Sequence, residues 1–133
     1  MSFLLDTDTC SAHLRRPSGL IHRFVQHSGR LYVSTLGLAE LYAWAYRRED
    51  PVPALAAIAK LVQFEVKLLD FDRACAEQFG MLRGIFRRQG VSVPPVDLMI
   101  ASVALVNDLT LVSHNTRDFR FVPNLRLEDW LEP

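Results

Sequence analysis

The sequence is poor in the residues that mark several classes of protein. Two of its 133 residues are cysteines, Cys10 and Cys75, which is too few for a disulfide framework, and no CxxC pair is present. No stretch approaches the roughly 20 apolar residues that a membrane span needs. The start of the chain has no basic segment, and Asp6 interrupts its short apolar run, which is unlike a signal peptide. We therefore expect a reduced, cytoplasmic protein that is not embedded in a membrane.

The composition is otherwise that of a folded domain. Half of the residues are hydrophobic and 23% are charged, with seven prolines and six glycines. These values exclude a collagen, a coiled coil and a disordered tail. The length is that of one domain, so we expect residues 1–133 to form a single domain with its own core.

Lysine is nearly absent, although the charges balance. The 15 basic residues include only Lys60 and Lys67, so 13 are arginine, and they face 15 acidic residues for a net charge of zero. A neutral chain does not suggest a nucleic-acid partner by itself. Arginine, however, binds phosphate oxygens better than lysine does, because its guanidinium group is a planar fork.

Short apolar runs alternate with helical patterns along the chain. The runs predict strands at 3–5, 31–33, 66–69 and 110–112, and the tail at 125–131 predicts a short strand and a helical turn. Helices are predicted at 9–15, from Leu20 to a stop at Ser28-Gly29, and at 35–48, 53–64, 72–89 and 96–107, with one helical turn at 116–119 and a turn at 17–19. This alternation predicts an α/β fold, a central parallel sheet with helices on both faces.

Acidic residues occur where apolar segments end or inside apolar helices. Asp6 follows the first strand, and Asp118 follows the turn after the strand at 110–112. Glu40 and Asp97 each lie in an otherwise apolar helix, close to its start. Ligand sites in open parallel sheets lie at the carboxyl ends of the strands, where these four side chains would meet.

Local ion pairing does not explain these carboxylates. Neither Glu40 nor Asp97 has a basic residue three or four positions away. Burying an unpaired carboxylate is costly unless it binds a metal, and carboxylate clusters suit hard cations such as Mg²⁺ or Mn²⁺. Each residue alone has a plainer interpretation, since Asp6 suits a helix cap, Asp97 a helix first turn and Glu40 a solvated helix face.

Five segments, in order and over nearly the whole chain, resemble the PIN-domain ribonucleases of the VapC toxin type. They are Phe3-Leu4-Leu5-Asp6-Thr7-Asp8, Val33-Ser34-Thr35 with Glu40-Leu41, Pro95-Val96-Asp97-Leu98-Met99-Ile100-Ala101, Leu111-Val112-Ser113-His114-Asn115-Thr116-Arg117-Asp118-Phe119 and Leu127-Glu128-Asp129-Trp130. Asp8 stands where asparagine is frequent in the family and Ser113 where threonine is frequent. Residues 91–93 lack the glycine that is often found there.

The resemblance implies a PIN-like fold and an Mg²⁺-dependent endoribonuclease, for which Mn²⁺ can substitute. It assigns the catalytic and metal-binding roles to Asp6, Glu40, Asp97 and Asp118. Ser34, Asn115, Thr116 and Asp8 are the supporting residues, and turn or cap formation is the plainer interpretation of the first three.

The resemblance also implies partners. Such toxins pair with a VapB-like antitoxin, whose C-terminal segment covers the acidic site and can insert a basic side chain, and they commonly form homodimers. The match looks nearest to members that cleave initiator tRNA, while messenger RNA, ribosomal RNA and DNA stay open. Leu38, Tyr42, Ala43, Tyr46 and the alanine-rich helix at 54–62 offer apolar surfaces for these contacts.

Arginine clusters are the candidates for RNA contact. With the four acids of the proposed site neutralised by metal, 15 basic residues face 11 acidic ones. We expect Arg15, Arg16, Arg117 and Arg120 to contact the RNA backbone, although a solvated helix face explains such clusters as well.

Two other interpretations fit part of the sequence. Asp6-Thr7-Asp8 also resembles the start of haloacid-dehalogenase-type phosphatases, but both lysines precede Ser113, which is the wrong order for that class. The second is a PIN-fold module that binds RNA or protein without catalysis. A degenerate module would usually have lost one of the four acids, and this chain has them all.

Overall fold

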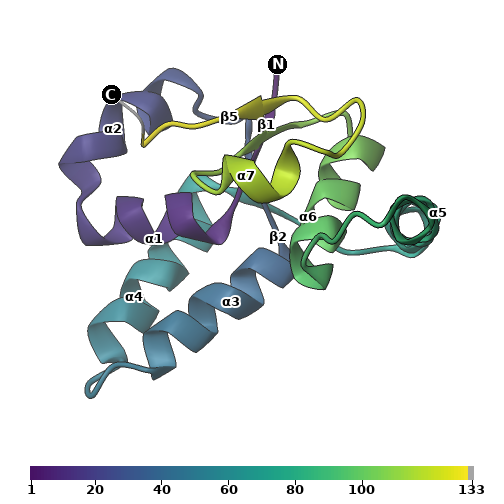
Figure 1. The fold of residues 1–133 in the computed structure, drawn as a ribbon. Helices are drawn as coiled ribbons and strands as arrows, with labels where there is room; N and C mark the ends of the chain where they lie inside the picture. Colours follow the sequence, from purple (N-terminus) through teal and green to yellow (C-terminus); the bar gives the residue numbers. More distant parts are fainter. Residues whose placement is uncertain (132–133) are drawn as a thin grey trace.

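The computed structural model describes residues 1–131, apart from the side chains of Pro17 and Ser18 (Figure 1). In chain order the elements are β1 (Phe3–Leu5), α1 (Thr7–Arg15), α2 (Pro17–Gln26), β2 (Leu31–Ser34), α3 (Thr35–Tyr46), α4 (Val52–Lys60), the π-helix η1 (Leu61–Glu65), β3 (Lys67–Leu69), α5 (Arg73–Gln89), α6 (Pro95–Val106), β4 (Thr110–Val112), α7 (Thr116–Phe119) and β5 (Leu127–Glu128).

The five strands form one parallel sheet in the order β3-β2-β1-β4-β5. The central strand β1 pairs with β2 through Phe3 and Leu31, and with β4 through Leu4 and Leu111. Every pairing in the sheet is parallel, so the carboxyl ends of all five strands lie at one edge. The prediction of a parallel α/β fold is confirmed.

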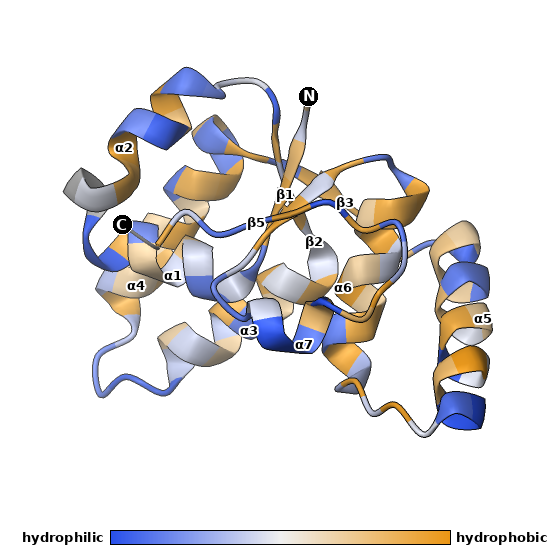
Figure 2. Cartoon of the chain, turned by 45° about the horizontal axis from the view of Figure 1, so that its top comes forward, coloured by the Kyte–Doolittle hydropathy of each residue, from blue (hydrophilic) through white to orange (hydrophobic). Residues whose placement is uncertain are grey.

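Helices cover both faces of the sheet. Successive side chains of β1 point to opposite faces and so belong to two different apolar clusters. Phe3 and Leu5 belong to the apolar cluster under α1 to α4, whereas Leu4 belongs to the cluster under α5 and α6. Figure 1 shows these two sets of helices on opposite sides of the strands. Colouring by hydropathy shows the apolar segments concentrated at the sheet and polar residues on the outer helix faces (Figure 2). None of the helices within residues 1–131 has the length and apolar character needed to cross a membrane.

The longest helix, α5, begins and ends as its sequence predicts. The side chain of Asp72 accepts a hydrogen bond from the backbone N–H of Cys75 at 3.0 Å, which caps the first turn. Gly90 ends the helix with a φ of 71°, a left-handed conformation that glycine adopts without strain. Leu82 and Phe86 on the inner face of α5 are buried against the α6 side of the core.

Two predicted boundaries are wrong. The turn expected at 17–19 is the first turn of α2, because a proline fits the first helical position, where its missing N–H is no loss. The single helix expected at 53–64 is α4 followed by η1, where the N–H of Val66 bonds to the carbonyl of Leu61, five residues back. The wider turn places Glu65 3.2 Å from the Nε2 atom of His13 on α1.

The tail contains the expected strand, β5, but no helical turn up to residue 131. The Oδ1 atom of Asp129 accepts a bond from the N–H of Leu131 at 2.9 Å, and this local turn replaces a helical one. The ring of Trp130 is buried and meets the ring of Phe3 edge-on at 5.3 Å, so the tail packs onto the first strand.

Candidate active site

Acidic side chains from three helices and the end of β1 line one pocket of about 430 Å³. Asp6 follows β1, Asp8 lies in the first turn of α1, Glu40 lies on α3, and Asp97 lies in the first turn of α6. The other residues that line it are Thr7, Ser11, Ala43, Trp44, Arg47 and Asn115. The parallel sheet explains this meeting, because the helices that follow β1 and β2 begin at its carboxyl edge.

Asp6 is the most buried of these carboxylates, with 6% of its surface exposed. It is the N-cap of α1, and one oxygen accepts the N–H of Thr7 at 2.9 Å. The other oxygen accepts the hydroxyl of Ser113 at 2.8 Å. The cap interpretation and the site interpretation of Asp6 are therefore compatible, since capping orients the carboxylate.

The turn after β4 holds Asp8 beside Asp6. The Oδ2 atom of Asp8 accepts the backbone N–H of His114 at 3.0 Å and lies 3.3 Å from the hydroxyl oxygen of Ser113. Ser113 is fully buried, so its single hydroxyl sits between two carboxylates. The serine that replaces the frequent threonine thus supplies the hydroxyl contact.

Glu40 is positioned by α1. The hydroxyl of Thr7 donates to the Oε1 atom of Glu40 at 2.6 Å, the shortest contact in the pocket. The contact joins residues 33 positions apart in the sequence. Glu40 is therefore held toward Asp6 and is not a freely solvated side chain.

Asn115 joins the remaining two carboxylates. Its amide nitrogen donates to Asp118 at 2.8 Å and lies 3.4 Å from the Oδ2 atom of Asp97. Asp97 and Asn115 are among the residues that line the pocket, whereas Asp118 is not. The structure therefore places Asp6, Glu40 and Asp97 at one pocket and links Asp118 to it through Asn115.

Two carboxyl groups of the pocket, those of Asp6 and Asp97, have raised pKa values. Burial raises the pKa of Asp6 to about 7, and the charge of Asp8 adds to this effect. Burial also raises the pKa of Asp97 to about 6, with further contributions from Asp118 and Glu40. Burial is the main cause of both shifts, and the neighbouring negative charges add to it.

The donor set fits a hard divalent cation. Four carboxylates line the pocket, and within residues 1–131 the one basic side chain that lines it is Arg47. No three Asp, Glu, His or Cys side chains in the described chain are already gathered as a ligand group. A bound cation would offset the repulsion between the carboxylates that line the pocket.

Two of the predicted supporting residues lie away from the pocket lining. Ser34 is buried and accepts the N–H of Gly37 at 3.0 Å, so it caps α3. Thr116 is exposed at the start of α7. The turn and cap interpretation fits both residues. Asn115, in contrast, donates to Asp118, and Asp8 shares the hydroxyl of Ser113 with Asp6.

The four arginines predicted to bind RNA do not line the acidic pocket. Arg15 and Arg16 line a separate hollow with Leu20 and Trp130, and the guanidinium of Arg120 lies over the ring of Phe121 at 4.8 Å. Arg117 is exposed on α7.

Sequence reasoning assigned none of Thr7, Ser11, Ala43, Trp44 and Arg47 to the site, although all five line the acidic pocket. Trp44 lies on α3, and Arg47 is the C-cap of that helix. Their spacing from Glu40 is the signal that could have found them, because residues four and seven positions further on share a helix face. The guanidinium of Arg48 lies 4.7 Å from the ring centre of Trp44, which holds the indole in place.

Known proteins resemble the chain over nearly its full length. Residues 3–125 match the PIN domain family. The chain is 37% identical to the tRNA(fMet)-specific endonuclease VapC of Shigella flexneri and 33% identical to that of Salmonella typhimurium, in each case over 98% of both chains. Among solved structures, the DNA-bound VapBC of Salmonella typhimurium matches with a TM-score of 0.91 and 33% identity, over 98% of each chain.

Proposed function

Since the chain belongs to the PIN-domain family, and within it to the VapC proteins, we propose that it is a metal-dependent endoribonuclease. The observation that carries the proposal is the group of carboxylates from β1, α1, α3 and α6 around one pocket, which lacks the basic residues needed to neutralise them. Such a pocket stores unfavourable negative charge, and a bound cation relieves it.

Asp6 and Asp97 are the proposed direct ligands of Mg²⁺, for which Mn²⁺ can substitute, and Glu40 and Asp118 complete the ligand set. A divalent ion held there supplies a bound water of lowered pKa and neutralises charge on the scissile phosphate. Both proposed direct ligands have raised pKa values, because burial disfavours the charged form of each carboxyl group.

The surrounding residues hold these carboxylates in place. Thr7 donates to Glu40, Ser113 donates to Asp6, and Asn115 donates to Asp118. Each donor removes rotational freedom from a ligand before the substrate arrives. Arg47 and Trp44 form the outer wall, where a guanidinium suits a phosphate and an indole suits a base.

Initiator tRNA is the proposed substrate, which places the activity in the cytoplasm. Two relatives that align over 98% of the chain are named tRNA(fMet)-specific endonucleases. The test is to incubate the purified chain with total tRNA and a structured control RNA in Mg²⁺, Mn²⁺ or EDTA. We expect discrete products in both metals and none in EDTA.

Substitution of Asp97 provides the first prediction. Asp97→Asn removes one ligand charge without changing side-chain size, and we expect cleavage to fall at least about 100-fold. Asp108→Asn is the matched control, because Asp108 is exposed, lies at a φ of 54° that asparagine tolerates, and should leave cleavage unchanged. Metal-dependent cleavage by Asp97→Asn at the parental rate would contradict the ligand assignment.

The alternative is a PIN-fold module that binds RNA or protein without cleaving it. No cleavage of any RNA by clean protein in either metal would favour that alternative. Stabilisation by Mg²⁺ in a thermal unfolding experiment separates the two, because a module without a working metal site gains nothing from the ion.

We also propose that the chain is the toxin of a toxin–antitoxin pair. Solved relatives include VapBC complexes from Salmonella typhimurium and Rickettsia felis. A VapB-like partner would cover the acidic pocket with its C-terminal segment and place a basic side chain among the carboxylates. Residues 1–133 would act as one domain and form a homodimer, and the exposed rings of Tyr42 and Tyr46 on α3 offer an apolar contact.

A further inference from the structure

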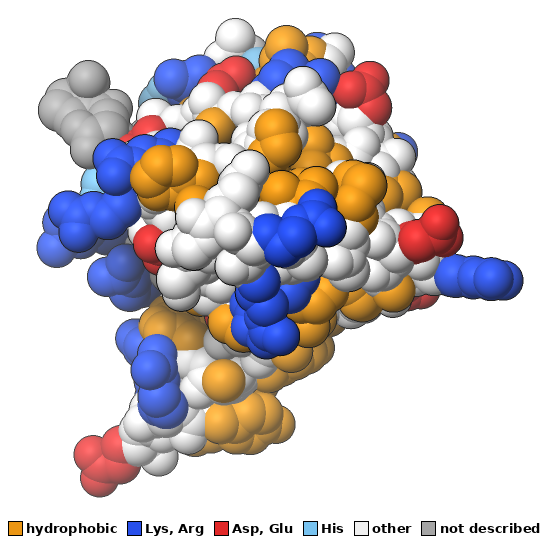
Figure 3. Space-filling model, turned by 45° about the vertical axis from the view of Figure 1, so that its right-hand side comes forward, with side chains coloured by type: hydrophobic (Ala, Val, Ile, Leu, Met, Phe, Trp, Pro, Cys, Tyr) orange, Lys and Arg blue, Asp and Glu red, His pale blue; other side chains and the backbone are white. Residues whose placement is uncertain are grey.

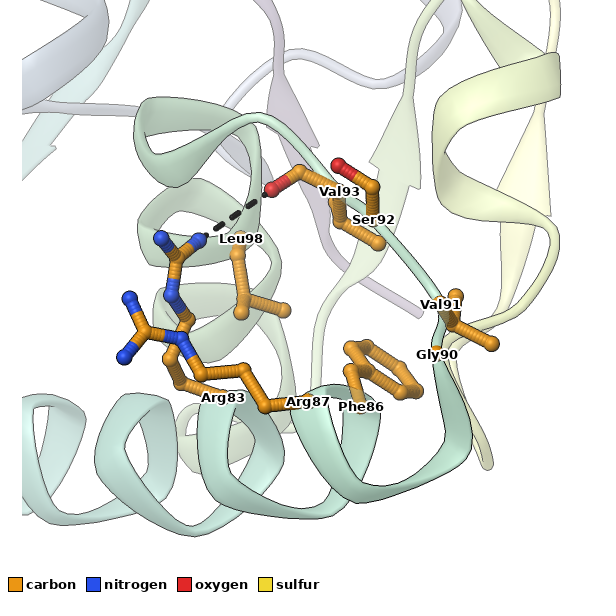
Figure 4. A pocket seen from close by; sticks show the side chains of 8 residues that line it. All are labelled: Arg83, Phe86, Arg87, Gly90, Val91, Ser92, Val93 and Leu98. Carbon is orange, nitrogen blue, oxygen red and sulfur yellow. Dashed lines mark hydrogen bonds between the residues drawn. The ribbon is translucent and has the colours of Figure 1, made fainter.

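A second hollow lies on the α5 side of the molecule, outside the acidic pocket. It has a volume of about 250 Å³ and is enclosed by the end of α5, the loop at 90–94 and the start of α6. Figure 4 shows its walls, with Arg83 and Arg87 side by side and Ser92 and Val93 across from them. No acidic side chain is among the residues that line it.

Within the described residues, the two arginines of this hollow have no acidic side chain as a partner. They are four residues apart on α5, a spacing at which like charges repel across one helix face. Within residues 1–131, the guanidinium of Arg83 bonds only to the carbonyl of Val93, at 3.4 Å, and the side chain of Arg87 makes no hydrogen bond or ion pair. The sequence explains this, because residues 78–96 hold three arginines and no acid.

The other walls suit a phosphate and its attached sugar. Ser92 adds a hydroxyl, and α6 begins just beyond the loop, so the positive end of its helix dipole is nearby. Phe86 and Leu98 form a buried apolar floor. Arg83 is half-buried and tied to the loop, so part of the basic group is fixed before any ligand arrives.

The position of the hollow relates it to the acidic pocket. Leu98 lines the hollow, and the preceding residue, Asp97, lines the acidic pocket. Successive residues of an α-helix lie 100° apart, so the two sites occupy neighbouring sides of the first turn of α6. Figure 3, which turns the α5 side of the molecule forward, shows basic side chains near the centre of this face and acidic ones toward its margins.

We propose that Arg83 and Arg87 form a binding site for a backbone phosphate of the RNA, away from the scissile bond. This inference rests on the proposed function, since it takes RNA as the substrate. The hollow would hold a nucleotide flanking the cleaved one, so that α6 carries the metal ligand on one side and supports the flanking strand on the other.

The experiment measures binding without cleavage. Labelled initiator tRNA is titrated with the full chain carrying Asp97→Asn, in EDTA, at several salt concentrations. Into this parent we introduce Arg87→Gln or, as the matched control, Arg88→Gln. Arg88 lies in the same last turn of α5 and has the same relation to the helix dipole, but it does not line the hollow.

We expect Arg87→Gln to weaken binding about five-fold or more and to lower the slope of log K against log salt by about 0.7, the value for one lost phosphate contact on a single strand. Arg88→Gln should change the affinity less than about two-fold. Arg83→Lys keeps the charge but loses the fork, and we expect an intermediate loss. Unchanged thermal unfolding of each variant shows that the losses do not come from misfolding.

Equal effects of Arg87→Gln and Arg88→Gln would overturn the proposal, because they would reflect net charge alone. The proposal would also be overturned if the parent and Arg87→Gln bound RNA equally well and inorganic phosphate stabilised the parent alone. That result would mean that the hollow binds a free anion and not RNA. Absence of cleavage by the unsubstituted chain would refute the proposed nuclease and leave the binding comparison intact, because no variant is scored on cleavage.

Discussion

At the scale of the residue, the hydroxyl of Thr7 is the contact with the sharpest consequence. It donates to the carboxylate of Glu40 at 2.6 Å and so links the start of α1 to α3. A hydrogen bond to a charged acceptor is worth roughly 1.5–3 kcal/mol. We therefore expect Thr7 to position Glu40 and to take no part in proton transfer.

This role predicts a difference between two small substitutions. Thr7→Val keeps the shape but removes the hydroxyl, and we expect about a 10-fold fall in cleavage rate, because a ligand that loses its orienting bond typically costs 10–100-fold. Thr7→Ser keeps the hydroxyl and should retain most of the rate. The check is kcat in saturating RNA across a Mg²⁺ titration, in which the valine variant should also need more metal.

Equal rates for Thr7→Val and Thr7→Ser would contradict the positioning role. If Thr7→Ser lost activity together with thermal stability while Thr7→Val kept both, the methyl group and not the hydroxyl would be the feature that matters. The pair thus separates packing from orientation at one position.

At the scale of the element, the residues that begin helices decide which side chains reach the pocket. Ser34 follows β2, caps α3 through the N–H of Gly37 and thereby begins the helix that carries Glu40. Asp6 does the same for α1 while also facing the pocket. A short strand followed at once by a capped helix is the unit that places acids at the sheet edge.

The cap of α3 gives the next prediction. Ser34→Ala leaves the N–H of Gly37 without its partner, and we expect the free energy of unfolding to fall by about 1 kcal/mol. Ser34→Thr keeps the cap and should lose less. Urea unfolding measures both, and cleavage by the folded alanine variant should stay near the parental level because Ser34 is not among the residues that line the acidic pocket.

A large loss of cleavage by folded Ser34→Ala would assign this residue a direct role at the pocket.

The helix predicted over 53–64 is an element for which the sequence-based prediction was wrong. Propensity favours one long helix over 53–64, but the π-turn at Leu61–Glu65 brings Glu65 to His13, a tertiary contact that no local pattern reports.

At the scale of the whole molecule, the buried carboxylates make stability depend on pH. The pKa of Asp6 is raised to about 7 from 3.8, so the folded protein keeps a proton that the unfolded chain loses near pH 4. Stability without metal should therefore fall as the pH rises from about 4 to about 7. Asp6 alone accounts for a loss of up to about 4 kcal/mol, and Asp97, with a pKa of about 6, acts in the same direction.

The measurement is thermal unfolding in EDTA between pH 5 and pH 8, for the unsubstituted chain and for Asp6→Asn. We expect the two curves to diverge with rising pH and Asp6→Asn to be the more stable protein at pH 8. The comparison cancels other titrating groups, including His27, whose pKa is lowered by burial and by Arg30. Added Mg²⁺ should stabilise the unsubstituted chain most at pH 8, where the carboxylates are charged.

Parallel curves for the two proteins would show that Asp6 carries an ordinary carboxyl group. Equal stabilisation of Asp6→Asn by Mg²⁺ would show that the ion binds elsewhere. The charged carboxylates lower the stability of the folded protein at the pH at which they bind metal. Functional residues commonly reduce stability in this way.

The parallel sheet and most of the helices are predictable from the sequence, and so is the candidate set of four acids. Apolar runs that end in Asp6 or in the 113–118 turn are local signals, and so are Asp72 and Gly90 at the ends of α5. Such signals predict the structure correctly because caps, turns and hydrophobic periodicity depend on residues that are only a few positions apart.

The residues that contact those acids depend on the tertiary structure and cannot be read from the sequence. The contacts of Thr7 with Glu40 and of Ser113 with Asp6 join residues 33 and 107 positions apart, and Arg83 and Arg87 form a hollow only because the loop after α5 folds back on them. Burial, and with it the raised pKa of Asp6, is likewise a property of the packed chain. Charge and hydrogen-bond geometry act through space, so a linear pattern names the residues of a site but not their partners.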